Sequence, residues 1–242
     1  RSCSPSGGGR TFPLLRLRTA RGIVRWPRGQ LMVGQESPLI SDVDPVSVAA
    51  IGSPAFAAAG NLWLWLPQVR VAYEHPGTLR FGAQGAVLAP TSGDPATAFD
   101  TDNDPAERSM RPYLQARAFA AWGESERGEL GCGVHRGWLV PTAERQSAVA
   151  FACDLVAPLA SWLELRGEVF RGEALRGLGG GGIGQNFSPA NAPLRSAGGW
   201  AQVNLLPTPV VAFGAGCGGD HPDPTAARRR NDLCAGYAML RP

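Results

Sequence analysis

The sequence predicts an all-β protein: an antiparallel up-and-down transmembrane β-barrel, present here only in part. Three observations carry this prediction. Apolar and polar residues alternate over many short segments, which is the period of a strand with two different faces. The chain has 32 glycines and 21 prolines among 242 residues, a composition that disfavours helices and suits strands joined by turns. The connections between these segments also alternate between short and long along the chain.

About eleven segments show the strand period. They lie at 11–25, 30–37, 62–74, 79–89, 111–123, 129–140, 146–157, 161–174, 199–206, 210–219 and 232–240. We therefore expect residues 1–10 to be a flexible start and residues 11–242 to form one barrel domain. The odd strand number predicts that this barrel is incomplete, because closed single-chain bacterial barrels have even numbers of strands. The opening RSCSPSGGGR, which has neither an initiator methionine nor a leader pattern, likewise favours a fragment or processed chain.

The connections between these segments alternate in length. Tight ones, such as those at 26–29 and 75–78, are followed by long loops near 38–61, 91–110, 176–198 and 220–231. In an up-and-down antiparallel sheet this order places every tight turn at one end and every long loop at the other. Outer-membrane barrels have this layout, whereas a soluble sandwich has no reason to sort its loops by end.

Each segment has one apolar and one polar face. In 79–89, for example, Leu79 and Phe81 oppose Arg80. Alternation alone does not separate a membrane barrel from a soluble one, which points its apolar face inward. Trp63 and Tyr73 favour the membrane barrel. They are ten residues apart, and in a tilted strand this separation spans roughly 25 Å, the height of the apolar belt between the two aromatic girdles of such barrels. Pro67 lies inside this stretch and requires a bulge, or a strand that pairs fully only after it.

The polar phase predicts the residues that line a pore. In a barrel with an apolar outer surface, the charged side chains point into the lumen, where arginines lower the barrier for anions. The alternative is that these charges pair with one another and only keep the wall wetted and stiff. The expected pore-lining residues are Arg16, Arg18, Arg70, Arg80, Gln84, Arg117, Glu164, Arg166 and Glu168.

Several other classes of protein are disfavoured. The formal charge of +3 is too small for a nucleic-acid binder. The most apolar stretch, 147–163, contains Asp154 and Pro158, so a membrane-spanning helix is not expected. The glycine-rich 177–186 lacks the GK[ST] ending of a phosphate loop, and the acidic 100–104 does not complete an EF-hand. The histidines belong to no nucleophile motif, so we predict no enzyme, no metal site and no cofactor.

The cysteines suggest cross-strand pairs. Cys132 and Cys153 flank the 141–145 connection, and Cys217 and Cys234 flank the 220–231 loop, each pair at equal or nearly equal distances. Each pair can therefore lie opposite on adjacent strands, where either a disulfide or two small apolar side chains would fit. The sequence leaves this choice open.

Four short motifs give a resemblance to a family. GQLMVGQ at 29–35, PQVR at 67–70 with Tyr73, GGIGQN at 181–186 and GGW at 198–200 resemble the DcaP-like porins, outer-membrane channels of Gram-negative bacteria. The likeness runs from about residue 14 to residue 240. It implies a homotrimeric barrel in contact with outer-membrane lipid that passes small anionic solutes, dicarboxylates among them. Two alternatives remain: a soluble or periplasmic barrel that binds a ligand, and an outer-membrane barrel with a structural role.

Overall fold

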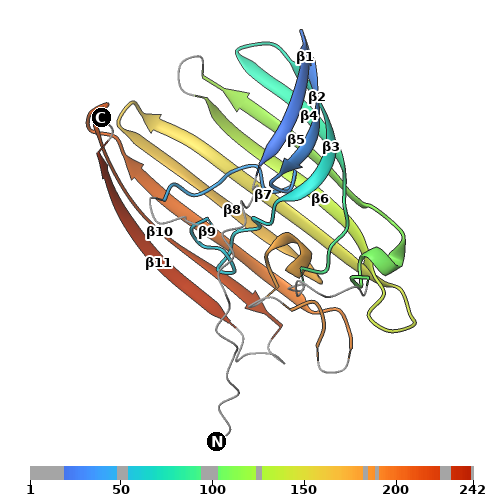
Figure 1. The fold of residues 1–242 in the computed structure, drawn as a ribbon. Coiled ribbons are helices and arrows are strands. Elements are labelled where there is room, and N and C mark those ends of the chain that lie inside the picture. Colours follow the sequence, from blue (N-terminus) through green and yellow to red (C-terminus); the bar gives the residue numbers. More distant parts are fainter. Residues whose placement is uncertain are drawn as a thin grey trace, which may run out of the picture.

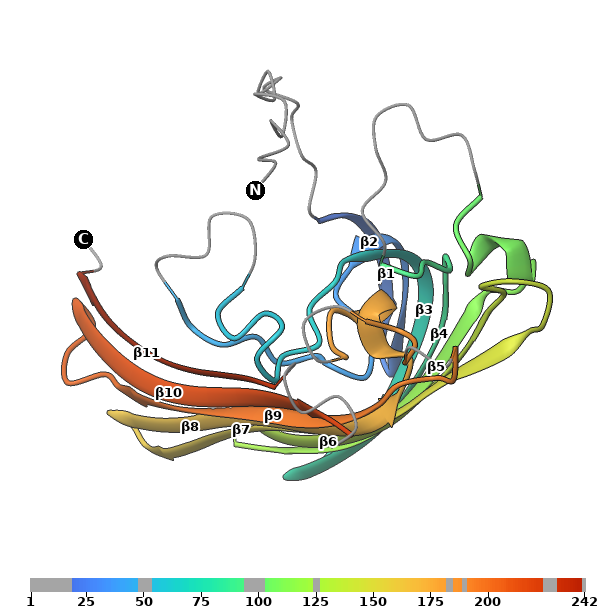
Figure 2. The same cartoon turned by 90° about the horizontal axis from the view of Figure 1, so that it is seen from below.

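The computed structural model describes residues 19–47, 54–93, 103–123, 127–181, 185–188, 191–223 and 230–240. They form one antiparallel sheet of 11 strands whose order in space is their order in sequence. The sheet curls into a deep trough (Figure 1, Figure 2). Among the described strands β1 and β11 do not pair with each other, so the trough is open. The all-β, antiparallel, up-and-down fold is thus confirmed.

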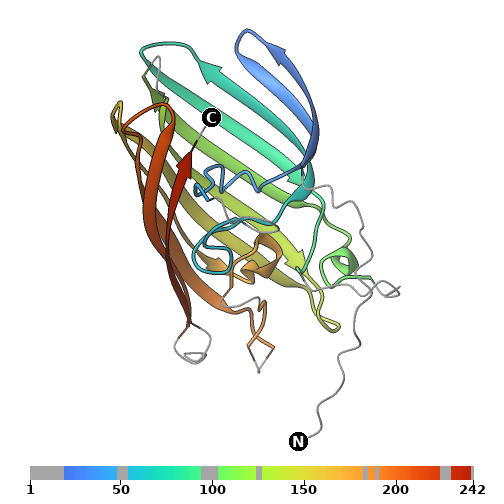
Figure 3. The same cartoon turned by 60° about the vertical axis from the view of Figure 1, so that its left-hand side comes forward.

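The strands lie close to the predicted segments. They are β1 (Ala20–Trp26), β2 (Gly29–Glu36), β3 (Leu66–His75), β4 (Leu79–Leu88), β5 (Tyr113–Trp122), β6 (Gly128–Leu139), β7 (Gln146–Ala160), β8 (Leu163–Glu173), β9 (Arg195–Leu205), β10 (Val211–Pro222) and β11 (Asn231–Leu240). Two 3-10 turns, η1 (Glu107–Ser109) and η2 (Leu175–Leu178), lie in long connections. No helix in this part of the chain is long and apolar enough to cross a membrane. The long connections gather at one end of the sheet, the lower end in Figure 3.

One expected strand starts later than predicted. The segment 62–74 becomes β3 only from Leu66, with Pro67 as its second residue. Trp63 is not on the outer surface, so the prediction that it marks an aromatic girdle is wrong. The indole ring of Trp63 lies against Gly179. The neighbouring Leu64 donates a backbone hydrogen bond of 3.3 Å to Leu178 of η2. The contact with η2 overrides the alternation that the sequence shows here.

The convex face of the sheet is apolar and exposed. Val71 is 50% exposed, Phe81 54%, Val134 53% and Phe151 52%, although all four lie in the interior of their strands. Near the short turns this face carries aromatic side chains: Trp26, Tyr73, Phe81, Trp122 and Phe213. The usual order of a soluble protein, with polar side chains outside and apolar side chains inside, is therefore reversed.

The two cysteine pairs form disulfides on this convex face. Cys132 is bonded to Cys153, and Cys217 to Cys234. The members of each pair are directly opposite in the strand register. Cys132 shares its side of β6 with the exposed Val134. The disulfides therefore join neighbouring strands from outside and leave the concave face to polar groups.

The open trough makes the two edge strands different from the rest. β1 and β11 each pair on one side only, so part of their backbone amides have no partner strand. In detergent micelles we expect amide hydrogens of β1 and β11 to exchange at least about tenfold faster than those of the central β6 and β7. Hydrogen exchange read by mass spectrometry tests this. Equal protection of edge and centre would mean that the edges are paired in solution.

Candidate functional site

A segment of the first long connection lies across the concave face. We call residues 37–47 the strap. Along its length it contacts strands that are far apart in the sheet. Arg70 of β3 donates to the Ser37 carbonyl at 2.9 Å, and the Ser41 hydroxyl donates to Glu168 of β8 at 2.7 Å. Gln202 of β9 exchanges two hydrogen bonds of 2.8 Å with the backbone of Val46. The strap is thus fixed to the sheet from β3 to β9.

The strap holds this position through its own apolar residues. Leu39 and Ile40 are fully buried and belong to the main apolar cluster. Ile40 packs directly on Gly133 of β6. A Cβ atom added at Gly133 would lie only 3.0 Å from Cγ2 of Ile40. Burying two such side chains contributes about 3–6 kcal/mol, which offsets part of the cost of desolvating the polar groups beneath the strap.

Arg117 of β5 is the centre of the polar contacts under the strap. Its guanidinium is fully buried and donates from Nε to Asp154 at 3.0 Å and from Nη1 to Glu129 at 2.8 Å. A second contact joins its Nη2 to the other oxygen of Asp154. Gly131 makes room for this group, because a Cβ there would overlap the guanidinium. Arg117 therefore bridges carboxylates of β6 and β7.

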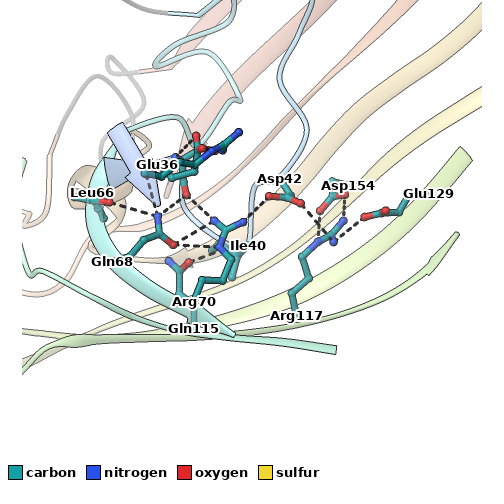
Figure 4. A network of polar contacts seen from close by, with 12 residues as sticks. Glu36, Ile40, Asp42, Leu66, Gln68, Arg70, Gln115, Arg117, Glu129 and Asp154 are labelled. Atoms are coloured by element: carbon teal, nitrogen blue, oxygen red, sulfur yellow. Dashed lines mark hydrogen bonds and ion pairs between the residues drawn. The ribbon is translucent and has the colours of Figure 1, made fainter. Parts of the chain in front are cut away.

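Asp42 of the strap joins two arginines of the wall. Its Oδ1 lies 2.9 Å from Arg70 and its Oδ2 lies 3.9 Å from Arg117. Figure 4 shows the carboxylate between the two guanidinium groups. Arg70 also donates to Gln68 at 3.3 Å. The strap thus supplies negative charge that the strands themselves lack at this point.

The contacts continue toward the short turns and surround a recess. Glu74 lies 3.2 Å from Arg80 and 3.0 Å from Arg127, and Arg127 lies 2.8 Å from Glu129. The recess has a volume of about 490 Å³, and its charged lining consists of Arg28, Asp42, Glu74, Arg80, Arg127 and Glu129. It lies between the strap and the short-turn end of the sheet. In this recess, charged side chains of both signs remain in contact with water and can bind a small polar solute.

The predicted pore-lining residues of the described strands all lie on the concave side. They are Arg70, Arg80, Gln84, Arg117, Glu164, Arg166 and Glu168. Arg16 and Arg18 lie outside the described residues. Arg80 and Gln84 line the recess. Arg70, Arg117 and Glu168 are buried by the strap, and they contact protein groups rather than an open lumen.

Most inward arginines face a carboxylate. The pairs are Arg21 with Glu36, Arg70 with Asp42, Arg80 with Glu74, Arg117 with Asp154, Arg127 with Glu129 and Arg166 with Glu164. The strap adds the acids Asp42 and Asp44, which reduces the excess of inward positive charge expected from the strands alone. Two arginines at the short-turn end, Arg25 and Arg28, pair with no carboxylate of the described residues.

Asp44 lies near the far end of the strap. Arg166 donates to its backbone carbonyl at 3.0 Å. The carboxyl keeps contact with solvent, yet the protein atoms of the trough around it desolvate it and raise its pKa; Asp42 raises it further, and Arg166 lowers it.

The sequence did not reveal the strap as part of the site, since 38–61 was expected to be one of the long loops at the rim. The sequence analysis also missed three charged residues of the site, because they lie outside the middle of the predicted strands. Asp42 is in the strap, Arg127 lies beside a turn, and Glu129 is at the start of β6. One signal was present, because Leu39 and Ile40 are adjacent large apolar residues inside a loop. Within the described residues no cluster of His, Cys, Asp or Glu has the arrangement of a metal site.

Comparisons with known proteins support the fold. No family model and no curated protein matches the chain. Among solved structures it is similar to the outer membrane channel DcaP of Acinetobacter baumannii, with a TM-score of 0.63 and 14% identity over 94% of this chain and 64% of that one. Two structures of OmpT, an outer membrane protein of Vibrio cholerae, have TM-scores of 0.46 and 0.43, with 10% and 8% identity. They cover 93% of this chain and 80% and 81% of theirs. The chain therefore has the fold of part of an outer-membrane barrel and spans 64% of the length of DcaP.

The buried pair of Arg117 and Asp154 should be costly to break from one side. Arg117→Gln leaves the buried carboxylate of Asp154 without its positive partner, so it should lower the free energy of unfolding by about 3–5 kcal/mol. Asp154→Asn should cost less, because Arg117 keeps its ion pair with Glu129. The double variant should cost at least about 1 kcal/mol less than the sum of the two. Urea unfolding of the refolded protein in micelles gives all four values.

The exposed pair of Arg195 and Glu173, 2.8 Å apart, is the matched control. Because water already solvates both groups, Arg195→Gln should change the free energy of unfolding by no more than about 1 kcal/mol. Equal effects at the two pairs would contradict the central role of Arg117.

Proposed function

We propose that this chain is part of an outer-membrane channel for small polar solutes, with its convex face in lipid and its concave face toward the pore. The observation that carries the proposal is the reversed distribution of polarity. Large apolar side chains such as Val71 and Phe81 are about half exposed outside, while the ion pairs lie inside. In a bilayer this arrangement is the stable one, because lipid solvates the apolar face and water the polar recess.

The aromatic residues near the short turns favour the same placement. Trp26 and Tyr73 are each 47% exposed on the convex side, at the level where aromatic rings meet lipid headgroups in barrels. A soluble ligand-binding barrel would have to leave all of this surface in water. We therefore favour the channel over the soluble alternative.

The family and its assembly are part of the proposal. We infer a relative of the DcaP-like porins that assembles as a homotrimer, on the motifs at 29–35, 67–70, 181–186 and 198–200 and on the fold shared with the DcaP channel. Light scattering of the detergent-solubilised protein would give the number of copies.

The class of solute follows from the charges left over after pairing. Arg28 lines the recess, and Arg25 pairs in the strand register with Gln30, another lining residue. Without carboxylate partners among the described residues, these two arginines leave a positive potential at the short-turn mouth. A Debye length of about 8 Å at physiological salt is comparable with a pore radius, so the potential reaches a passing solute. Small anions, carboxylates among them, should pass more readily than cations.

Replacing both arginines tests this preference. Arg25→Gln with Arg28→Gln removes two charges that make no ion pair in the described structure, so the protein should assemble while its anion preference falls. The measurement is the reversal potential across a salt gradient in planar bilayers, where a shift toward zero is expected. Arg111→Gln with Arg136→Gln, which alters the convex face by the same charge, should leave the reversal potential unchanged. A cation-selective parent, or identical values for all three proteins, would refute the proposed preference.

A further inference from the structure

An arginine–tryptophan cluster lies on the convex face at the long-loop end. Trp138 of β6 points to the same side as the exposed Val134. The guanidinium of Arg111 lies 5.1 Å from the centre of its indole ring and that of Arg136 lies 5.6 Å from it. Both distances allow cation–π attraction. One ring thus holds two positive charges close together at the long-loop boundary of the apolar belt.

These charges have no protein counterpart in the described part of the chain. No carboxylate there forms an ion pair with Arg111 or Arg136, although two other exposed arginines of this rim, Arg195 and Arg230, pair with Glu173 and Asp232. Arg108 lies close by in the chain and is exposed. Two like charges beside one ring repel each other, and an anion between them would remove that cost.

An apolar groove adjoins the cluster on the same face. It has a volume of about 1190 Å³, and its lining includes the apolar Val33, Val69, Val87 and Met110 and the charged Glu107, Arg108 and Arg111. The three valines are 52%, 46% and 48% exposed, and Met110 is 91% exposed. Such an apolar concavity is unfavourable in water and is readily filled by hydrocarbon.

The strand register joins groove and cluster into one surface. Val33 lies opposite Val69, Val69 opposite Val87, Val87 opposite Leu114, and Leu114 opposite Arg136. An apolar row therefore runs across β2 to β5, in the right half of Figure 1, and ends on the arginine of β6. Hydrocarbon along this row would carry an attached headgroup to the arginines.

We propose that this surface binds one phosphorylated lipid, with its phosphate between Arg111 and Arg136 and an acyl chain in the groove. The planar guanidinium fork matches two phosphate oxygens and forms charge-assisted hydrogen bonds. Trp138 orients both forks toward the boundary where headgroups lie. The site rests on the membrane placement proposed above but not on conduction, because its residues lie on the convex face.

The test is binding of a lipid whose phosphate is a monoester. The full chain, refolded in neutral detergent micelles, is titrated with dimyristoyl phosphatidic acid, and native mass spectrometry counts the bound lipid. The parent should retain one molecule per chain. Arg111→Gln with Arg136→Gln should weaken binding at least about tenfold, because both guanidinium groups that form charge-assisted hydrogen bonds with the phosphate are lost. Arg25→Gln with Arg28→Gln carries the same charge change on the concave side and should bind like the parent.

Two further measurements identify the ligand. Dimyristoylglycerol, which has no phosphate, should bind much more weakly, and inorganic phosphate should compete only at far higher concentration than the lipid. If inorganic phosphate binds as tightly as phosphatidic acid, the site takes free phosphate and the lipid proposal is wrong. If the groove instead holds a second copy of the chain, the protein remains associated and retains no lipid, which also overturns the proposal.

The remaining outcomes separate this site from the channel. Equal loss of lipid in both double variants would mean attraction by net charge alone and would refute a defined site. A protein that conducts in planar bilayers but retains no phosphatidic acid would refute only the lipid site. A chain that stays folded in water without detergent would refute the membrane placement itself.

Discussion

A single sheet has no second layer on which to pack, and this constraint shapes the molecule. One face of the trough carries side chains such as Val71 and Phe151, which are about half exposed, and the other carries arginines and carboxylates. The polar face can be covered only by connections that fold back onto it. The strap, residues 37–47, meets this need by bringing the buried apolar side chains of Leu39, Ile40 and Val43 and the carboxylate of Asp42 onto the concave surface.

The ion pairs follow from the same constraint. An arginine on the concave face of an empty trough would be solvated, but once the strap covers it the charge needs a partner. Arg117 meets this need with Asp154 and Glu129 from neighbouring strands, and Arg70 with Asp42 from the strap. The short-turn end of the trough, beyond the strap, keeps water beside its charges. Function is expected there because Arg28, Arg80 and Arg127 remain accessible.

Much of the sheet could be predicted from local pattern, because an alternation with period two is a property of neighbouring residues. Segment 79–89 became β4 and 146–157 became most of β7, and the order of loop lengths set the up-and-down topology. The strap could not be predicted in this way, because its position depends on contacts between residues far apart, such as Ser41 with Glu168. Trp63 was misassigned for the same reason. Spacing allowed the cysteine pairs, but only the register of β6 with β7 and of β10 with β11 placed them opposite each other.

The central claim is that lipid covers the convex face, and one substitution tests it directly. Val134 is 53% exposed in the middle of β6, between Ala116 and Phe151 of its neighbours. Unfolding free energies of the parent and of Val134→Arg, refolded into phospholipid vesicles, should differ by about 2–4 kcal/mol, because arginine at the bilayer centre is costly. Leu79→Arg, near a short turn, should cost no more than about 1 kcal/mol. If Val134→Arg instead changes stability by less than about 0.5 kcal/mol, as at an ordinary water-exposed site, the convex face meets water and the account is wrong.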